Sequence, residues 1–475
     1  GMTVAQHTKY WIAWLFVSSM LGSWLAYAML NESADRTIFM PGDLSPGHHQ
    51  LAEACDACHT DAFGGGDVIQ QACVDCHGKD RVKPFDSHPV KKFKDPRNAE
   101  LLENVNALKC VTCHTEHRPE ITVKDGLTQP LDVCFHCHQE IAKDRPSHQG
   151  MGFDTCKDSG CHNFHNNRAL YTDFLIKHLN ESAYLDEMKL PSKEFAGLLE
   201  EIIEYPRDSY PVTRLDESDI DAVDKLALSP EIKMDWLETA HAASGVNCSA
   251  CHGGLQGDKN KAEWISHPDH TVCESCHNIE AGRFLEGKHG MRLKQGLSAM
   301  TPEQAQLPMK NDSKHLELNC TSCHGAHRFD VKGAAVEACL GCHDDSHSVA
   351  YKDSPHFDLW QKEISGEAGE NSGVSCASCH MPRTNYDVSE WMSRIVVDHN
   401  QSASLSPNSK MLRSSCLHCH GLEFSLAALT DKSLIDNNFN GAPGNSVKSM
   451  DLAREEHTRR QQESAEDDDS DMFGF

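Results

Sequence analysis

The most chemically distinctive feature of the chain is a recurring pair of cysteines that is followed directly by a histidine. The clearest copy is Cys320-Thr321-Ser322-Cys323-His324. Two thiols at this spacing can add to the vinyl groups of a haem as thioethers, and the adjacent imidazole can then bind the iron as its proximal ligand. The pattern therefore predicts a covalently attached c-type haem.

The pattern occurs eleven times, ten times with two residues between the cysteines and once with four, and it uses all 22 cysteines of the chain. We therefore expect eleven covalently attached haems. Their attachment residues are Cys55, Cys58 and His59; Cys73, Cys76 and His77; Cys110, Cys113 and His114; Cys134, Cys137 and His138; Cys156, Cys161 and His162; Cys248, Cys251 and His252; Cys273, Cys276 and His277; Cys320, Cys323 and His324; Cys339, Cys342 and His343; Cys376, Cys379 and His380; and Cys416, Cys419 and His420. We number these motifs 1 to 11 in chain order.

Paired cysteines also form zinc ribbons, redox dithiols and disulfides. None of these sites requires a histidine directly after the second cysteine. Histidine makes up 31 of the 475 residues, so chance would place it there in about 6% of pairs. Its presence after all eleven pairs excludes these alternatives as the general explanation.

Composition and charge limit the fold and the partners. Hydrophobic residues make up 39% of the chain and aromatic residues 7%. Between Cys55 and His420 there is one expected haem for about every 33 residues, which leaves little chain for an ordinary core. The haems must supply much of the buried apolar surface, so we expect a mostly α and irregular fold with short helices, long loops and little sheet. The net charge of −27 argues against binding nucleic acid.

An uncharged apolar run from residue 10 to residue 30 is long enough to cross a bilayer as a helix. Lys9 precedes this run, and Glu32 and Asp35 follow it. This charge bias predicts a cytoplasmic N-terminus, a helix in the inner membrane and a haem region that is exported to the periplasm. The alternative is a cleaved signal peptide, since Ala26-Tyr27-Ala28 fits a cleavage site; the length and tryptophan content of the run favour a retained anchor.

The motifs divide the chain into predicted domains. We expect a membrane anchor or signal peptide at 1–35, a five-haem module at 36–180 and an acidic helical connector at 181–235. A six-haem module follows at 236–425, and 426–475 is expected to be an acidic and largely disordered tail.

The second axial ligand decides whether a haem carries electrons or binds substrate, because a filled sixth position excludes a substrate from the iron. Twenty histidines lie outside the motifs, which is enough for every iron to have two. As distal ligands we favour, in the first module, His48, His88, His117 and His148, with His165 or His178 as the fifth. In the second module we favour His241, His289, His315, His347, His356 and His399. Ranked below these are His49, His136, His267, His270, His327 and His418, and the methionines Met291 and Met381.

Two family resemblances appear at these residues. The dense motifs of the first module, with one stretched copy, resemble the cytochrome c3-like (class III) multihaem cytochromes. In the second module, Ser354-Pro-His356-Phe-Asp-Leu-Trp360 and the later Cys376-Ala-Ser-Cys379-His380-Met-Pro-Arg383 resemble segments of the pentahaem nitrite reductases and octahaem hydroxylamine oxidoreductases. The first resemblance implies closely stacked haems with two histidine ligands. The second implies that His356 and His399 are distal ligands.

One departure from the second family bears on activity. Pentahaem nitrite reductases carry their catalytic haem on a motif that ends in lysine, and all eleven motifs here end in histidine. No catalytic residues are therefore assigned. We expect an electron-transfer protein that passes electrons from a quinol-oxidising membrane complex, or from quinol, to soluble cytochromes or outer-membrane acceptors. The alternative is a reductase or oxidase of nitrite, hydroxylamine, tetrathionate or a similar compound at one open haem of the second module.

Overall fold

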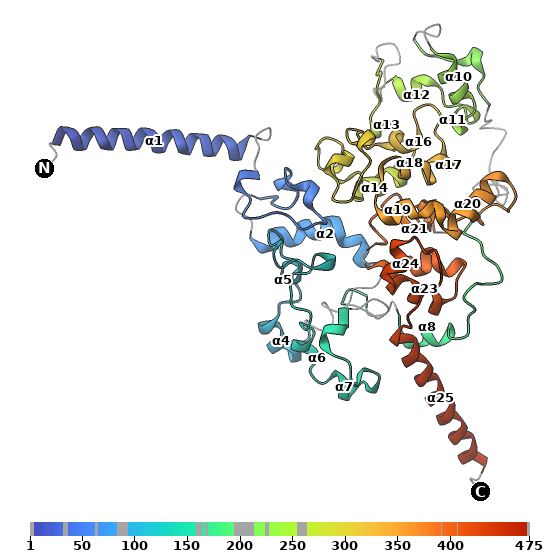
Figure 1. Ribbon diagram of the computed structural model, residues 1–475. Helices are drawn as coiled ribbons and strands as arrows, with labels where there is room; N and C mark the ends of the chain where they lie inside the picture. Colours follow the sequence, from blue (N-terminus) through green and yellow to red (C-terminus); the bar gives the residue numbers. More distant parts are fainter. Residues whose placement is uncertain are drawn as a thin grey trace. The chain divides into compact units, whose positions relative to one another are not determined.

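The structure is a computed structural model of the 475-residue chain. It describes residues 4–31, 37–61, 65–82, 94–157, 164–166, 170–193, 213–223, 228–253, 264–390, 392–405 and 407–472. Figure 1 shows that helices and irregular segments make up nearly all of this part of the chain.

Most helices have one to three turns, as expected for a fold with little ordinary core. In the first part of the chain they are α1 Val4–Leu30, α2 Gly66–Val82, α4 Ala99–Asn104, α5 Cys110–Cys113, α6 Phe135–His138, α7 Ile141–Asp144 and α8 Thr172–Lys177. The later helices are α10 Pro230–Leu237, α11 Ala240–Ala243, α12 Cys248–His252, α13 His270–Glu274, α14 Asn278–Glu286, α15 Met291–Lys294, α16 Cys320–His324, α17 Val331–Ala335, α18 Glu337–Cys342, α19 Ser346–Ala350, α20 Pro355–Ser365, α21 Cys376–His380, α22 Met411–Ser414, α23 Leu422–Thr430, α24 Lys432–Asp436 and α25 Lys448–Met472.

The strands of the described residues form one antiparallel hairpin, β1 Arg383–Ser389 and β2 Met392–Val397. Arg383 pairs with Val397 at its open end. The backbone N–H of Asp398 then donates to the carbonyl oxygen of Pro382, at 3.0 Å. The hairpin therefore returns the chain close to motif 10 at His380.

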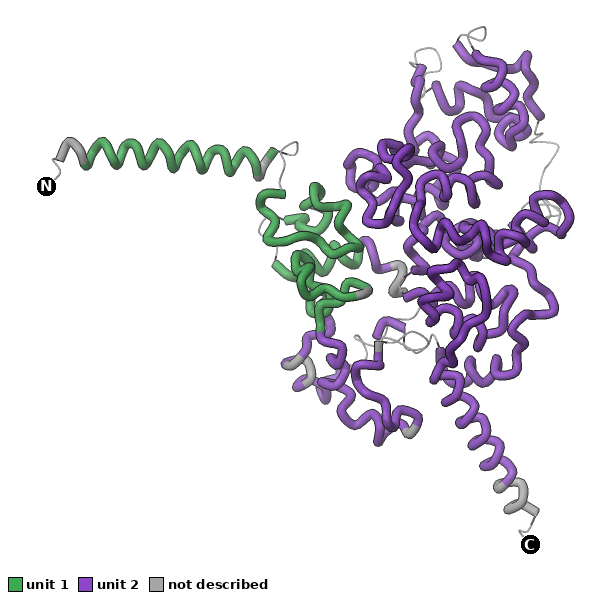
Figure 2. Tube along the Cα trace, viewed as in Figure 1, with its two compact units in different colours: residues 1–75, 109–129 green, residues 76–108, 130–475 purple. Residues whose placement is uncertain are grey.

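The chain forms two compact units, which Figure 2 shows in different colours. Unit 1 comprises residues 1–75 and 109–129, and unit 2 comprises residues 76–108 and 130–475. These bounds differ from the predicted domains. Motifs 1 and 3 belong to unit 1, whereas motifs 4 and 5 cluster with the six later motifs.

Helix α1 contains a 22-residue stretch, His7–Ala28, that is long and apolar enough to cross a membrane. Its large side chains are exposed in the structure, including Trp11, Phe16 and Trp24. A row of exposed aromatic and aliphatic side chains suits a lipid environment. A signal sequence near the N-terminus has the same length and composition, so the helix is compatible with either expectation.

The largest apolar cluster of the described residues lies at the C-terminal end of unit 2. It joins α8, α22, α23 and the start of α25, and Leu422, Leu426 and Met450 are almost completely buried in it. Val447 and Ala453 are also buried there. The first two turns of α25 therefore belong to the core.

This packing differs from the disordered tail expected at 426–475. Helices α23 to α25 cover most of that range. Further along α25, Arg459 and Arg460 both pair with Glu456, and Arg459 also pairs with Glu463. Ion pairs at these helical spacings support a solvated helix. The acidic composition concealed the buried positions near residue 450, since only a few apolar residues are needed to dock the helix.

The docking of α25 can be tested at Met450, which is 0% exposed. Met450→Ala should lower the free energy of unfolding by about 2–5 kcal/mol, because it leaves a cavity in the cluster. Urea unfolding of the haem-loaded protein, followed by circular dichroism, measures this. The control Gln462→Ala changes an exposed residue of the same helix and should stay within about 0.5 kcal/mol. Equal stability of the two variants would contradict the docked helix.

Candidate haem-binding sites

Each described motif forms a turn of helix that holds its two cysteines and its histidine together. The histidine N–H donates to the carbonyl oxygen of the first cysteine, for example His59 to Cys55 at 2.8 Å and His420 to Cys416 at 2.9 Å. The two cysteines are three residues apart and so share one face of the turn. This arrangement is what attachment to one haem edge requires.

Local sequence explains why these turns form. Asn247, Asn319 and Ser375 each stand directly before a motif and cap its helix, with a side-chain oxygen that accepts from a backbone N–H. Asparagine and serine are among the best N-cap residues because they satisfy amide groups that have no helical partner. The motifs at α12, α16 and α21 therefore carry their own helix-start signal.

Seven motif histidines face a second histidine across a gap of nearly constant width. The ring-centre separations are 6.5 Å for His59 and His117, 5.9 Å for His252 and His327, 6.0 Å for His277 and His241, 6.2 Å for His324 and His399, 6.3 Å for His343 and His289, 6.1 Å for His380 and His347, and 6.2 Å for His420 and His356.

This separation fits a metal ion between the two rings. A metal–imidazole bond of about 2 Å on each side, with roughly 1 Å from ring nitrogen to ring centre, places two opposed rings about 6 Å apart. Direct ring stacking would bring the centres closer, and an ordinary hydrogen bond between rings would leave no space for an ion. The donor set therefore fits an iron with two axial histidines, which is a common ligation of c-type haem.

Four of the facing histidines lie on or beside helices. His241 is in α11, His347 in α19 and His356 in α20, and His289 lies in the turn between α14 and α15. Helix α20 begins with a buried Ser354 cap and a proline at its first position. These features fix the start of the helix, and thus the position of His356, from local sequence.

Two further facing histidines share an unusual backbone conformation. His117 and His327 each follow a motif histidine by three residues, and their φ angles are +60° and +64°. A left-handed conformation is uncommon for residues other than glycine, so an external constraint must hold it. Each turns its ring toward the histidine of an earlier motif, at His59 and His252.

Second-sphere hydrogen bonds set the tautomer of several imidazoles. The Nδ1 atom of His117 lies 2.8 Å from the carbonyl oxygen of Gly42, and that of His252 lies 2.7 Å from the carbonyl oxygen of Ile265. The same contact is made by His114, His347, His399 and His420. Because a carbonyl can only accept, Nδ1 carries the proton and Nε2 is free to bind a metal.

Burial keeps the central imidazoles of unit 2 neutral. Burial, together with a smaller repulsion from the facing histidine, lowers the pKa of His289, His356 and His380 to about 4. A metal can bind only the neutral form of an imidazole. These rings are therefore in the ligand form throughout the neutral pH range.

The structure reverses the order of two sequence predictions. His315, one of the six favoured in the second module, has a side chain that is 86% exposed and lies 3.4 Å from Glu303. In the described part of the chain no motif ring faces it. His327, which was ranked lower, faces His252 instead. A sequence signal was available, because His327 has the same spacing from its motif as His117.

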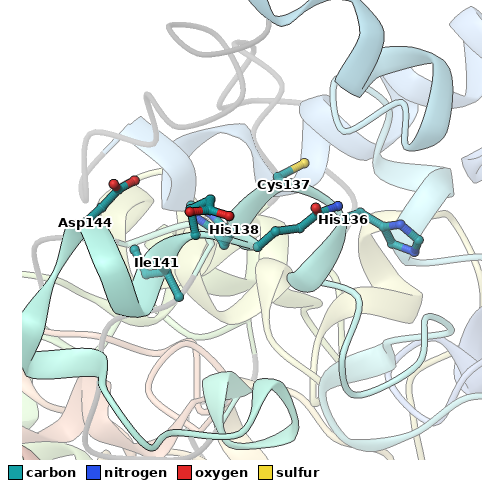
Figure 3. Close-up of a pocket in the computed structure, with 7 residues that line it drawn as sticks. His136, Cys137, His138, Ile141 and Asp144 are labelled. Atoms are coloured by element: carbon teal, nitrogen blue, oxygen red, sulfur yellow. The ribbon is translucent and has the colours of Figure 1, made fainter.

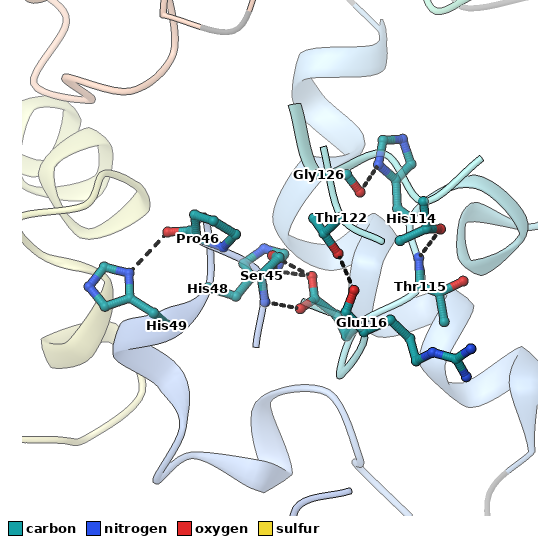
Figure 4. Close-up of polar contacts among 11 residues, drawn as sticks. Ser45, Pro46, His48, His49, His114, Thr115, Glu116, Thr122 and Gly126 are labelled. Carbon is teal, nitrogen blue, oxygen red and sulfur yellow. Dashed lines mark hydrogen bonds and ion pairs between the residues drawn. The ribbon is translucent and has the colours of Figure 1, made fainter. Parts of the chain in front are cut away.

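In unit 1, His48 lies in a polar network shown in Figure 4. Its Nδ1 atom is 2.7 Å from Oε1 of Glu116, which also accepts from the hydroxyl of Ser45. Burial favours the neutral acid, but the hydrogen bonds from His48 and Ser45 outweigh it and lower the pKa of Glu116 to about 2. A carboxylate that accepts from Nδ1 orients the ring and makes it a stronger ligand.

The remaining predicted residues are not part of the seven facing pairs. His148 contacts the hydroxyl of Ser147, His165 contacts Phe164, and His178 lies 2.5 Å from the carboxylate of Glu181. Motif 4 borders a pocket lined by residues that include His136, Cys137 and His138, as Figure 3 shows. His88, Cys161 and His162 lie outside the described residues.

The attachment cysteines of successive motifs are neighbours. Cys273 of motif 7 lies next to Cys320 of motif 8, and Cys339 of motif 9 lies next to Cys376 of motif 10. The other steps also bring cysteines near one another: Cys251 is near Cys273 and Cys276, Cys323 is near Cys339 and Cys342, and Cys379 is near Cys416 and Cys419. The six later motifs therefore adjoin one another in chain order.

Comparison with known proteins gives matches to cytochromes with c-type haem. Residues 47–139 and 312–392 match the cytochrome c3 family model. The multihaem cytochrome MtrA of Shewanella baltica is 21% identical over 211 residues, which cover 39% of this chain and 48% of the relative. The cytochrome c-type protein Cgr1 of Eggerthella lenta is 24% identical over 165 residues, which cover 30% of this chain and 67% of the relative.

The chain thus spans about half the length of the first relative and about two thirds of the second. No solved structure matches it significantly.

The two stretches that match the family model share a motif spacing. First cysteines stand at 55, 73 and 110 in one stretch and at 320, 339 and 376 in the other, so gaps of 18 and 37 residues recur as 19 and 37. A histidine after the third motif faces the histidine of the first in each case: His117 faces His59 within the first stretch, and His399, seven residues beyond the second stretch, faces His324. The motifs, the facing imidazoles and these matches together identify the chain as a multihaem c-type cytochrome, a protein that transfers electrons.

Proposed function

We propose that this cytochrome is a membrane-anchored periplasmic electron conduit with eleven covalently bound haems, most or all of which have two axial histidines. Each haem iron would supply a one-electron ferric–ferrous couple. The role of the chain is to hold the irons close together, to fill both axial positions and to exclude small ligands. Electrons would pass from a quinol-oxidising complex, or from quinol at the membrane, to soluble or outer-membrane acceptors.

The observation that carries this proposal is the set of seven facing imidazole pairs. All six motif histidines of the later module take part: His252, His277, His324, His343, His380 and His420. An enzyme that binds nitrite or hydroxylamine at iron needs one axial position free of protein ligands. The geometry of this module therefore favours carriage of electrons over catalysis.

The neighbouring cysteines support one path through the later module, in the order of motifs 6 to 11. Within unit 2, Figure 1 shows the motif helices following one another from α12 through α16 and α21 toward α23. The two ends of this path share a feature. The ring of Trp264 stacks on His252 with an interplanar angle of 7°, and that of Phe424 stacks on His420 at 17°. Such rings would shield the outer face of each terminal imidazole, where no further motif of this series covers it.

Helix α1 supports attachment to the membrane. The proposal is that it is retained as an anchor in the inner membrane, so that the haem region works in the periplasm. The anchor would keep the first motifs close to a quinol-side donor, which raises the local concentration of the two partners. The strongly acidic chain would favour redox partners with basic docking surfaces.

Electron paramagnetic resonance of the oxidised protein tests the proposed function. We expect every haem to be low-spin and the spectrum to stay unchanged when nitrite or hydroxylamine is added, because both axial positions are filled. Two classes of low-spin signal should appear. The near-parallel rings of His252 and His327, at 12°, give a rhombic signal, whereas the near-perpendicular rings of His380 and His347, at 80°, give a more anisotropic one. A high-spin haem that responds to nitrite would favour the enzyme instead.

The assignment of His327 over His315 gives a matched pair of variants. His327→Ala should convert one haem to a high-spin form that binds carbon monoxide when reduced, because His252 then lacks its facing ligand. His315→Ala should leave the optical spectrum unchanged, because the side chain is exposed. Carbon monoxide difference spectra measure both. The opposite result, with binding only in the His315 variant, would overturn the assignment.

The stretched motif gives a prediction on stoichiometry. The intact mass of the protein should exceed the mass of its chain by eleven haem groups. The double variant Cys156→Ala, Cys161→Ala should lose one group, because both thioether positions of motif 5 are removed. An unchanged mass difference in the variant would show that four intervening residues do not permit attachment and that the native protein carries ten haems.

A further inference from the structure

His399 differs from the other facing histidines of unit 2 in how the chain holds it. It follows the strand β2 and is separated from the last motif histidine, His380, by the whole hairpin. Its counterpart in unit 1, His117, follows its motif histidine by three residues. A longer connection leaves more freedom to the ring at its end, so the ring of His399 needs a further tether.

A partly buried ion pair next to His399 can provide such a tether. Arg283, on α14, makes two parallel hydrogen bonds to the carboxylate of Asp398: Nε to Oδ1 and Nη2 to Oδ2, both 2.8 Å. The Asp398 side chain is 9% exposed and that of Arg283 is 24% exposed. A two-pronged pair fixes the orientation of the carboxylate as well as its distance. Arg283 also pairs with Glu286 of the same helix.

The pair is one of several contacts that fasten this turn. Oδ1 of Asp398 accepts the backbone N–H of Asn400 at 2.9 Å, and the N–H of Asp398 is bonded to Pro382. The turn also packs tightly on the end of α14, where a Cβ atom added at Gly287 would lie 3.2 Å from the Cα atom of Asn400. His399 is therefore held between two fixed residues, with its Nδ1 bonded to the carbonyl oxygen of Val397 at 2.9 Å.

The helix that carries Arg283 is itself part of the haem framework. Helix α14 begins directly after His277 of motif 7 and ends three residues before His289, which faces His343 of motif 9. The Arg283–Asp398 pair thus connects helix α14 to the residue directly before His399, which faces motif 8. The two paired residues are more than one hundred positions apart in the sequence.

We propose that Arg283 is a positioning residue that keeps His399 on the iron of motif 8, and so keeps that haem closed to small ligands. This inference rests on the proposed function, because it assumes that His399 and His324 are the two axial ligands. The pair of Arg283 with Asp398 holds the one distal ligand of this module that lies beyond a hairpin. Without it, the ring would leave the iron for part of the time and expose a sixth position.

The test is Arg283→Met in the full haem-loaded protein, with spin state and carbon monoxide binding as readouts. Methionine keeps much of the side-chain volume but cannot bond to Asp398. We expect one haem to become partly high-spin and to bind carbon monoxide when reduced. Added imidazole should return it to the low-spin state, because it supplies the missing ligand. This rescue shows that the change lies in the sixth position of the iron and not in the attachment of the haem.

Three further variants make the test specific. Arg283→Met with Asp398→Asn also lacks the tether, but leaves no unpaired buried carboxylate, and it should open the same haem. Arg283→Lys keeps the charge without the two-pronged contact, and it should give a smaller high-spin fraction while disturbing the fold least. Arg394→Gln is the matched control. It removes an ion pair of 3.6 Å between β2 and Glu280 on the same helix, and it should leave the spectrum unchanged.

The outcomes separate the two proposals. If the unaltered protein already contains a high-spin haem that binds carbon monoxide, the proposed ligation fails. If the unaltered protein is fully low-spin and both Arg283→Met and Arg283→Lys remain so, the hairpin alone holds His399 and the positioning role is wrong. If Arg394→Gln opens a haem as readily as the Arg283 variants, the effect is a general loosening of the hairpin, which also overturns the proposal.

Discussion

The structure depends on one recurring arrangement, in which two imidazoles from distant parts of the chain face each other. Their ring centres lie about 6 Å apart, which leaves a gap for a metal ion. Each gap joins a motif helix to another segment. His241 precedes motif 6 yet faces motif 7, and His399 follows motif 10 yet faces motif 8. The six later sites are therefore interlaced, and a metal bound in one gap would fasten segments that frame the others. This explains how a chain with so few apolar residues can hold a defined arrangement.

Ordinary packing has a secondary role and forms small apolar clusters beside the haem motifs. The largest apolar cluster joins α8, α22, α23 and α25, next to motif 11. A smaller one at Ile220 and Trp236 packs against Cys248 of motif 6. Both clusters border a motif at one end of the later series. A third cluster, around Val336 and Trp360, packs against Cys376 of motif 10 within the series. Cofactor sites and small apolar clusters together therefore form the core.

The seven sites are not equivalent, and their differences bear on electron transfer. Some facing rings lie on helices, two lie in left-handed turns at His117 and His327, and His399 lies beside the partly buried ion pair of Arg283 with Asp398. The ring planes range from nearly parallel to nearly perpendicular. Axial-ligand orientation and hydrogen bonding are two of the means by which a protein tunes its haems. The chain therefore has the means to give chemically identical cofactors different properties.

The sequence by itself determined the attachment chemistry, the expected number of haems, the short-helix fold and the apolar N-terminal helix, because each depends on residues that are adjacent along the chain. It also predicted His117, His241, His289, His347, His356 and His399, which the structure brings opposite motif histidines. Only the tertiary structure decided which motif each of them faces, that His327 and not His315 faces His252, and that the acidic C-terminal segment docks as a helix. These features depend on contacts between residues far apart in the sequence, where motif spacing and composition carry no information about which segments meet.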